Sequence, residues 1–113
     1  MGKQEALSKV GDYDYPRGFK TVTSSNITAV LFEAYNKEFH DKKGREYLKK
    51  FPDAKGVMVI RFKGEKFYRY VDVPYTVYAH LVNAPSVGSY FANNIRDKYK
   101  GEKLWKLEQV LSH

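Results

Sequence analysis

The sequence contains no cysteine, which excludes disulfides, thiolate zinc sites and cysteine nucleophiles. It also has no run of roughly 18 apolar residues, the length that a membrane-spanning helix needs. The longest apolar stretches are Ala29–Phe32 and Val57–Ile60, and Met1–Val10 has no apolar segment of signal-peptide length. We therefore expect a cytoplasmic protein that does not associate with membranes.

Histidine is scarce, and the positions of the three histidines suggest neither a metal site nor a catalytic site. No pair among His40, His80 and His113 has the spacing of metal ligands. The serines lack the context of a nucleophile elbow, and the glycines form neither a phosphate-binding loop nor a dinucleotide fingerprint. We therefore expect no catalytic residue, no metal and no cofactor, in a protein that is not an enzyme.

What the chain has in excess is positive charge and tyrosine. Its 113 residues suit a single domain. Lysine and arginine number 20 against 13 acidic residues, a net charge of +7, and 16% of the residues are aromatic. This combination is typical of a surface that binds phosphates and flat rings. It is also typical of a small basic domain with an aromatic core, so composition leaves both interpretations open.

Alternating apolar residues predict four strands, at Phe19–Ser24, Ile27–Tyr35, Val57–Phe62 and Phe67–Val71. The last two are separated by a short turn containing glycine and read as a β-hairpin. Between the second and third strands, residues 36–56 form a lysine-rich segment that we call the basic insertion. Its apolar residues are spaced as on one face of a short helix that Pro52 ends.

After residue 71 the apolar period changes from 2 to 3.6, which predicts two helices. Asp72 is the expected N-cap of the first, with Pro74 in its first turn. Ser86 is the expected N-cap of the second, and Gly101 is expected to stop it. Strands followed by helices predict an α+β fold, an antiparallel sheet of about four strands with two or three helices packed on one face.

The expected domain spans residues 19–101, with the basic insertion inside it. Residues 1–18 are predicted to be a flexible segment, in which a short helix at Gln4–Val10 is one option. Residues 102–113 form a C-terminal tail, predicted as a short helix or a strand at Lys103–Gln109. Because Trp105 stands close to Leu104 and Leu107, we expect this tail to help form a homo-oligomer.

Six short motifs occur together between residues 22 and 99. They are Val22–Ile27 with its Ser-Ser pair, Val59–Gly64, the Tyr-x-Tyr pattern in Phe67–Tyr70, the pairs Val73–Pro74 and Val77–Tyr78, the Ala-x-Ser-x-Gly-x-Tyr-Phe pattern of Ala84–Phe91, and Ile95–Arg96. In this set the chain resembles the KTSC domain, a module at the C-terminus of some lysyl-tRNA synthetases that also occurs alone in bacteria and phages. The resemblance implies that domain's fold and a role in binding nucleic acid.

The chain departs from the family pattern at two places. Ala92 follows the Tyr-Phe pair where the family has asparagine, and two asparagines come only afterwards, at Asn93 and Asn94. The link between the second and third strands is also longer than usual, because it contains the basic insertion. That insertion could track a nucleic-acid backbone or could simply be solvated, and its sequence does not decide between the two.

Two motifs suggest a ligand site, and each has a structural alternative. Tyr68 and Tyr70 could stack on a base beside Arg69, or they could form the sheet face beneath the helices. Strand alternation places Arg69 on the face opposite to the two tyrosines. Ser86–Ser89 could hold an anion at a helix N-terminus, where Gly88 would allow close approach, or could be a plain serine cap.

The remaining candidates are basic, amide or aromatic side chains nearby. Basic residues would contact phosphate, the asparagines a base edge, and the aromatic rings of the second helix a base. The full set of candidate ligand-binding residues is Arg61, Lys63, Tyr68, Arg69, Tyr70, Ser86, Gly88, Tyr90, Phe91, Asn93, Asn94 and Arg96.

The charges are scattered, which suits a pocket better than a surface that follows a long polymer. We therefore expect a non-catalytic protein that binds or sequesters a small phosphate-bearing nucleotide, for example a phage protein that captures a nucleotide immune signal. An RNA- or tRNA-binding accessory domain is the alternative. A purely structural, oligomerising protein is the third option.

Overall fold

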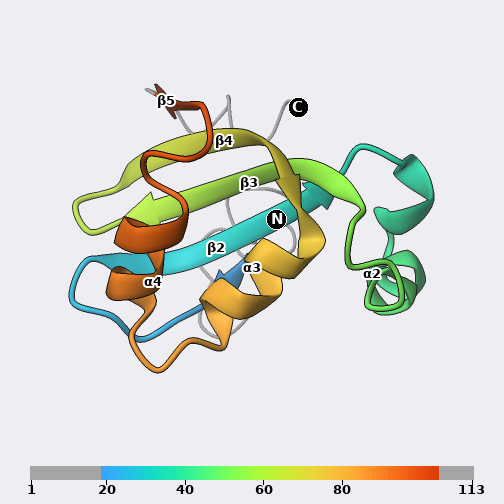
Figure 1. Cartoon of the computed structure of the whole chain (residues 1–113), viewed down its shortest axis with the longest axis horizontal. Helices are drawn as coiled ribbons and strands as arrows, with labels where there is room; N and C mark the ends of the chain where they lie inside the picture. Colours follow the sequence, from blue (N-terminus) through green and yellow to red (C-terminus); the bar gives the residue numbers. More distant parts are fainter. Residues whose placement is uncertain (1–18, 105–113) are drawn as a thin grey trace, which may run out of the picture.

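The computed structural model describes residues 19–104, which form a five-stranded antiparallel sheet with helices on one face (Figure 1). The strands are neighbours in sequence order: β1 (Lys20–Thr21), β2 (Ile27–Ala34), β3 (Lys55–Phe62), β4 (Lys66–Pro74) and β5 (Gly101–Leu104). The α+β class is confirmed, with five strands where about four were expected. The predicted N-terminal segment and the tail beyond residue 104 lie outside the described residues.

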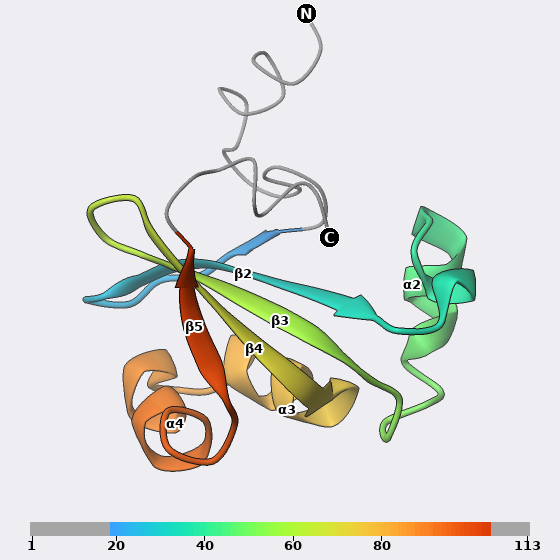
Figure 2. The ribbon, with the colours of Figure 1, turned by 90° about the horizontal axis from the view of Figure 1, so that it is seen from above.

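Helices α3 (Tyr75–Val82) and α4 (Val87–Asn94) cover one face of the sheet (Figure 2). Alternation along β3 sends Met58 and Ile60 to this face, where Leu81 of α3 and Phe91 of α4 are buried against the same core. Val59 points to the opposite face and belongs to a smaller cluster with Phe19, Ala29, Leu31, Phe67 and Leu104. No helix in residues 19–104 is long and apolar enough to cross a membrane.

Asp72 does not cap α3, contrary to the sequence-based expectation. It lies within β4, and Pro74 is the residue at the helix N-cap, with no side-chain hydrogen bond there. The first N–H groups of α3 are instead satisfied by the end of the basic insertion. Tyr75 N–H donates to the carbonyl of Ala54 at 2.8 Å, and Thr76 N–H donates to that of Pro52 at 3.0 Å.

The end of the domain also differs from the expectation. α4 ends at Asn94, and Gly101 begins β5 rather than stopping a helix. A Cβ at Gly101 would overlap the ring of Tyr70, so glycine allows β5 to pass over that ring. Residues 102–104 of the predicted tail form a strand that pairs with β4, which agrees with the strand option for the tail and not with the helix.

The basic insertion connects the end of β2 to the start of β3 and lies beside the sheet rather than on its face (Figure 1). It contains the short 3-10 helix η1 (Lys37–Phe39) and helix α2 (Lys42–Leu48). A short helix is therefore present as predicted, but it ends at Leu48 and not at Pro52, so Phe51 lies outside it. Asp41 caps α2 by accepting a hydrogen bond from Gly44 N–H at 2.7 Å. A Cβ at Gly44 would overlap the Glu38 carbonyl oxygen, so glycine lets α2 and η1 pack closely.

Tyr35 and Asp72 hold a β-bulge between β3 and β4. The register shifts there, so that Val71 and Asp72 both oppose Val57, and Asp72 adopts a φ of 58°. The Tyr35 hydroxyl donates to Asp72 Oδ1 at 2.8 Å and accepts from Asp72 N–H at 2.9 Å. These two bonds offset part of the roughly 1–2 kcal/mol that a left-handed conformation costs a non-glycine residue.

We predict that Tyr35→Phe lowers the free energy of unfolding by about 1 kcal/mol, because both hydrogen bonds to Asp72 are lost. Urea denaturation followed by circular dichroism measures the change. Adding Asp72→Gly should recover part of the loss, because glycine adopts a positive φ without steric cost. An unchanged stability of Tyr35→Phe would show that the bulge does not depend on this hydroxyl.

Candidate ligand-binding groove

The loop between β1 and β2, residues 22–26, carries the Ser-Ser pair and is tied to the β3–β4 hairpin. Asn26 accepts a hydrogen bond from Lys63 N–H through its backbone carbonyl at 2.8 Å. Within the loop, Ser24 Oγ lies 3.4 Å from Asn26 N and 3.5 Å from Ile27 N. We call this segment the serine loop, and its position is set by the sheet to which both of its ends belong.

Helix α4 begins with the serine cap that the sequence predicted. Ser86 Oγ accepts from Ser89 N–H at 3.3 Å, and Ser86 itself has an extended backbone. The N–H groups of Val87 and Gly88 have no acceptor within the helix, because the residues four positions before them lie outside it. At the start of α3, the carbonyls of Ala54 and Pro52 accept hydrogen bonds from the first N–H groups of the helix. The start of α4, in contrast, borders a hollow.

A groove of about 660 Å³ separates the serine loop from the start of α4. Its walls are residues 23–27 on one side and residues 85–89 on the other, with Phe62, Phe91, Ala92 and Arg96 completing the lining. The two walls approach closely, since a Cβ at Gly88 would lie 3.7 Å from Ser24 Oγ. Two of the motif segments, far apart in sequence, thus meet at one place.

Arg96 is the only charged residue among the described residues that line the groove. Its side chain is 59% exposed, and its nearest carboxylate is that of Asp97, at 4.0 Å from Nε. A surface pair at this distance is weak and leaves the guanidinium free to turn toward a ligand. The groove therefore combines one positive charge, several hydroxyls and backbone N–H groups, all able to donate hydrogen bonds.

Only four of the twelve candidate residues line the groove, namely Ser86, Gly88, Phe91 and Arg96. Tyr70 is buried, and its ring centroid lies 5.8 Å from that of Phe91. Tyr68 is half-buried, with its ring 5.5 Å from that of Phe62. Both tyrosines thus belong to the sheet face beneath the helices, as the structural alternative predicted.

Arg61 and Arg69 lie on the opposite face of the sheet. Arg61 donates to Thr28 Oγ1 at 3.1 Å and pairs with Glu65, while Arg69 Nη2 lies 3.1 Å from Glu102 Oε2. The predicted separation of Arg69 from the two tyrosines is confirmed. Neither arginine can contribute to the groove, because strand alternation directs both away from it.

The other four candidates do not line the groove. The backbone N–H of Lys63 is bonded to the serine loop, and its side chain is exposed. The ring of Tyr90 packs 6.2 Å from that of His80. Asn94 Nδ2 donates to the Tyr90 carbonyl at 3.2 Å, and Asn93 is exposed.

Sequence reasoning missed the other wall of the groove. Thr23, Ser24, Ser25 and Asn26 form it, and Phe62, which also lines the groove, was missed as well. The Ser-Ser pair stands in one of the sequence motifs but not among the candidate binding residues, because nothing local indicates which distant segment a loop faces. Within residues 19–104, no group of three His, Asp or Glu side chains could hold a metal ion.

Comparison with known proteins shows what part of the chain is similar to. Residues 50–99 match the KTSC domain. The predicted resemblance is therefore confirmed over this stretch, which includes the α4 wall of the groove but not the serine loop. A crystal structure of a KTSC domain protein from Yersinia pestis matches with a TM-score of 0.56 and 22% identity, over 77% of this chain and 96% of that chain. No curated protein matches the chain.

The burial of Tyr70 in this KTSC fold has a consequence at high pH. Burial raises the pKa of Tyr70 to about 12, with a smaller contribution from neighbouring Tyr68, while the charge of Arg96 acts in the opposite direction. Because the folded state holds the proton more tightly than the unfolded state, Tyr70 stabilises the fold below pH 10. This stabilisation is lost as the pH rises from about 10 to about 12.

We therefore predict that Tyr70→Phe reduces the dependence of stability on pH in this range. Urea midpoints at pH 9 and pH 11.5 measure the dependence for both proteins. The midpoint of the unsubstituted chain should fall further than that of the variant. Equal decreases would mean that the Tyr70 hydroxyl is accessible to solvent.

Proposed function

We propose that the groove binds a small phosphate-bearing nucleotide without catalysis. The observation that carries the proposal is the meeting of the serine loop and the start of α4 around one hollow that contains a single charge, that of Arg96. Its volume of about 660 Å³ falls in the roughly 300–1,000 Å³ range of small-molecule sites. One positive charge and a bounded hollow suit a small anion better than a long polymer.

The polar side of the groove offers the contacts that a phosphate needs. The N–H groups of Val87 and Gly88 start a helix whose dipole favours an anion, and hydroxyls from both walls add donors. The guanidinium of Arg96 can bind phosphate oxygens through two parallel hydrogen bonds. The phosphate therefore belongs between the start of α4 and the serine loop.

The apolar side of the groove suits a flat ring. Phe62 and Phe91 line it, with their ring centroids 5.5 Å apart in an edge-to-face arrangement. Ile27 and Val87 add aliphatic surface beside them. A nucleotide with its phosphate at α4 would place its base against these side chains.

Binding without turnover is the form of this function that we propose, because no carboxylate or histidine lines the groove among the described residues. Sequestration of a nucleotide signal, as by a phage protein against host immunity, requires only tight binding and slow release. A cytoplasmic location is part of the proposal and is supported by the absence of cysteine. A homo-oligomer is also part of it, and native mass spectrometry reports subunit number and retained ligand together.

Binding of RNA is the second candidate, and one observation favours it. Exposed lysines gather on the basic insertion around α2, whereas no lysine among the described residues lines the groove. A polymer backbone requires several phosphate contacts on a continuous surface, which the groove does not offer. An RNA site would therefore lie on the insertion.

We predict that Arg96→Ala weakens nucleotide binding by at least about tenfold, because a charged hydrogen-bond donor is lost. Isothermal titration calorimetry with a panel of nucleoside mono-, di- and triphosphates and cyclic dinucleotides measures the change. Arg69→Ala is the matched control, since it removes the same charge from the opposite face and should bind normally. Equal losses in the two variants would contradict the assignment of the groove.

Gly88→Ala separates folding from binding at the same site. The added methyl group has ordinary contact distance to Ser24 Oγ, so the chain should fold with stability equal to or up to about 1 kcal/mol above that of the unsubstituted protein. The methyl group nevertheless narrows the entrance between the two walls. We therefore predict weaker nucleotide binding, measured by calorimetry, at unchanged or higher thermal stability. Unchanged binding would place the ligand elsewhere.

A further inference from the structure

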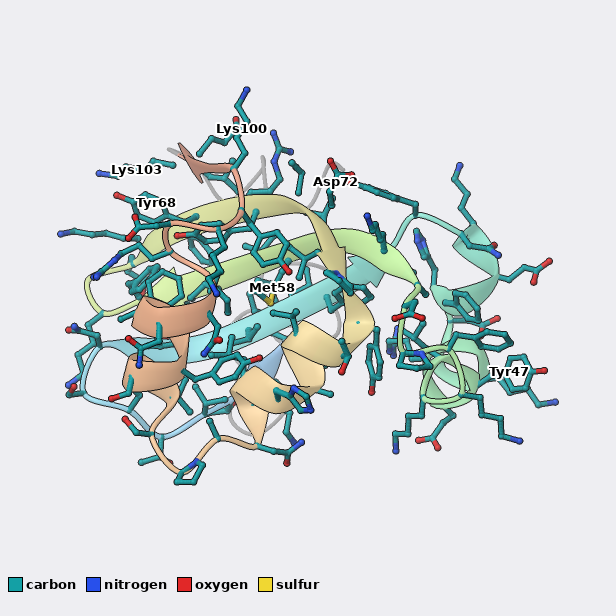
Figure 3. All side chains as sticks on the ribbon, viewed as in Figure 1. Tyr47, Met58, Tyr68, Asp72, Lys100 and Lys103 are labelled. Carbon is teal, nitrogen blue, oxygen red and sulfur yellow. The ribbon has the colours of Figure 1, made fainter. Side chains whose placement is uncertain are left out.

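The exposed aromatic residues of the described chain gather at one place. The large hydrophobic side chains with substantial exposure in residues 19–104 are Tyr35, Tyr47 and Phe51, all within or next to the basic insertion. The Tyr35 hydroxyl is bonded to Asp72 and serves the bulge. Tyr47, at 53% exposure, and Phe51, at 42%, have no comparable structural role, and Tyr47 points away from the sheet (Figure 3).

These two rings are nevertheless held in place. The ring of Phe51 lies 5.5 Å from that of buried Phe39 and 5.2 Å from that of Tyr47, which makes a row of three rings from the interior to the surface. At Gly44, α2 packs closely against the backbone of Glu38 and Phe39 in η1, which keeps the two helices together. The exposed rings therefore present flat surfaces without the entropy cost of ordering them on binding.

Lysines flank the exposed rings on α2 and in the turn that follows it. Lys43 stands four residues before Tyr47 and shares a helical stripe with it. Lys50 lies in the turn after α2, where its N–H donates to the Tyr47 carbonyl at 3.0 Å. Lys50 Nζ lies 5.6 Å from the centroid of the Tyr47 ring. All three residues line a hollow of about 570 Å³.

Three carboxylates also border this hollow, those of Glu38, Asp41 and Glu46. Asp41 caps α2 through the hydrogen bond to Gly44 N–H. Glu38 and Glu46 are exposed. Residues 36–56 as a whole carry seven basic and four acidic side chains, so the insertion that surrounds the hollow is positively charged.

We propose that Lys43, Tyr47, Lys50 and Phe51 form a docking surface for single-stranded nucleic acid, with bases stacked on the two rings and phosphates beside the lysines. Stacking on aromatic rings tolerates any base, and flanking cations follow the backbone. A duplex would not fit this surface, because its bases are stacked on one another. Helix α2 lies at the opposite end of the sheet from α4 and the serine loop (Figure 1). The proposal therefore does not depend on nucleotide binding in the groove.

The test uses the full chain and fluorescently labelled 12-nucleotide single strands, one of RNA and one of DNA, with anisotropy measured over a range of salt concentrations. Tyr47→Leu should weaken binding by at least about fivefold, because the stacking surface is lost. Tyr47→Phe should retain binding. If Leu and Phe at this position bind equally, the proposal is overturned.

The lysines require a charge-matched control. Replacing both Lys43 and Lys50 with Gln should reduce the slope of log affinity against log salt by about one unit. Replacing exposed Lys66 and Lys98 with Gln removes the same charge away from the insertion and should leave the slope nearly unchanged. Equal effects of the two double variants would show that net charge alone attracts the strand. Circular dichroism verifies that each variant is folded.

Two further results distinguish this surface from the groove and from a protein interface. Arg96→Ala should bind the oligonucleotides normally, even where it no longer binds nucleotides. A loss of oligonucleotide binding in Arg96→Ala, with normal binding in Tyr47→Leu, would assign the strand to the groove and overturn the proposal. Absence of any oligonucleotide binding at low salt would also overturn it and leave a protein partner as the occupant of the exposed rings.

Discussion

The packing of α4 against the sheet is the interaction on which the candidate groove depends. Phe91 and Ile95 are buried against the core that Tyr70 and Ile60 build from the sheet side. Removing a buried phenylalanine from such a core typically costs about 3–5 kcal/mol, so the orientation of α4 is strongly specified. With that orientation set, the N-terminus of α4 can only face the serine loop, which the hydrogen bond from Lys63 holds in place.

The same packing separates the two kinds of aromatic residue in this chain. Tyr70, Phe91 and their neighbours fill the interface between sheet and helices, where they contribute apolar area and edge-to-face contacts. Tyr47 and Phe51 lie outside that interface, on an insertion that ties back to the body through the carbonyls of Pro52 and Ala54. The number of aromatic residues could not distinguish the buried group from the exposed group, because both follow regular spacing in the sequence.

The fold could be predicted further than the site. Strands β2, β3 and β4 were expected within a few residues of their observed bounds, because alternation over several residues is a local signal. Asp72 was misassigned because a positive φ at a bulge depends on the neighbouring strand and on Tyr35, which is distant in sequence. Gly101 was misassigned because its need for a small residue comes from the ring of Tyr70, across the β4–β5 pair.

The sequence by itself determined the α+β class, the placement of Arg69 and the two tyrosines on opposite faces of the sheet, and the serine cap of α4. All of these follow from short-range periodicity or from a hydrogen bond between near neighbours. Only the tertiary structure decided that Ser86, Gly88 and Arg96 meet the serine loop while Arg61 and Arg69 do not. The physical reason is that the groove lies between segments that are far apart in the sequence. The packing of buried side chains brings these segments together, and no local sequence pattern indicates which segments will meet.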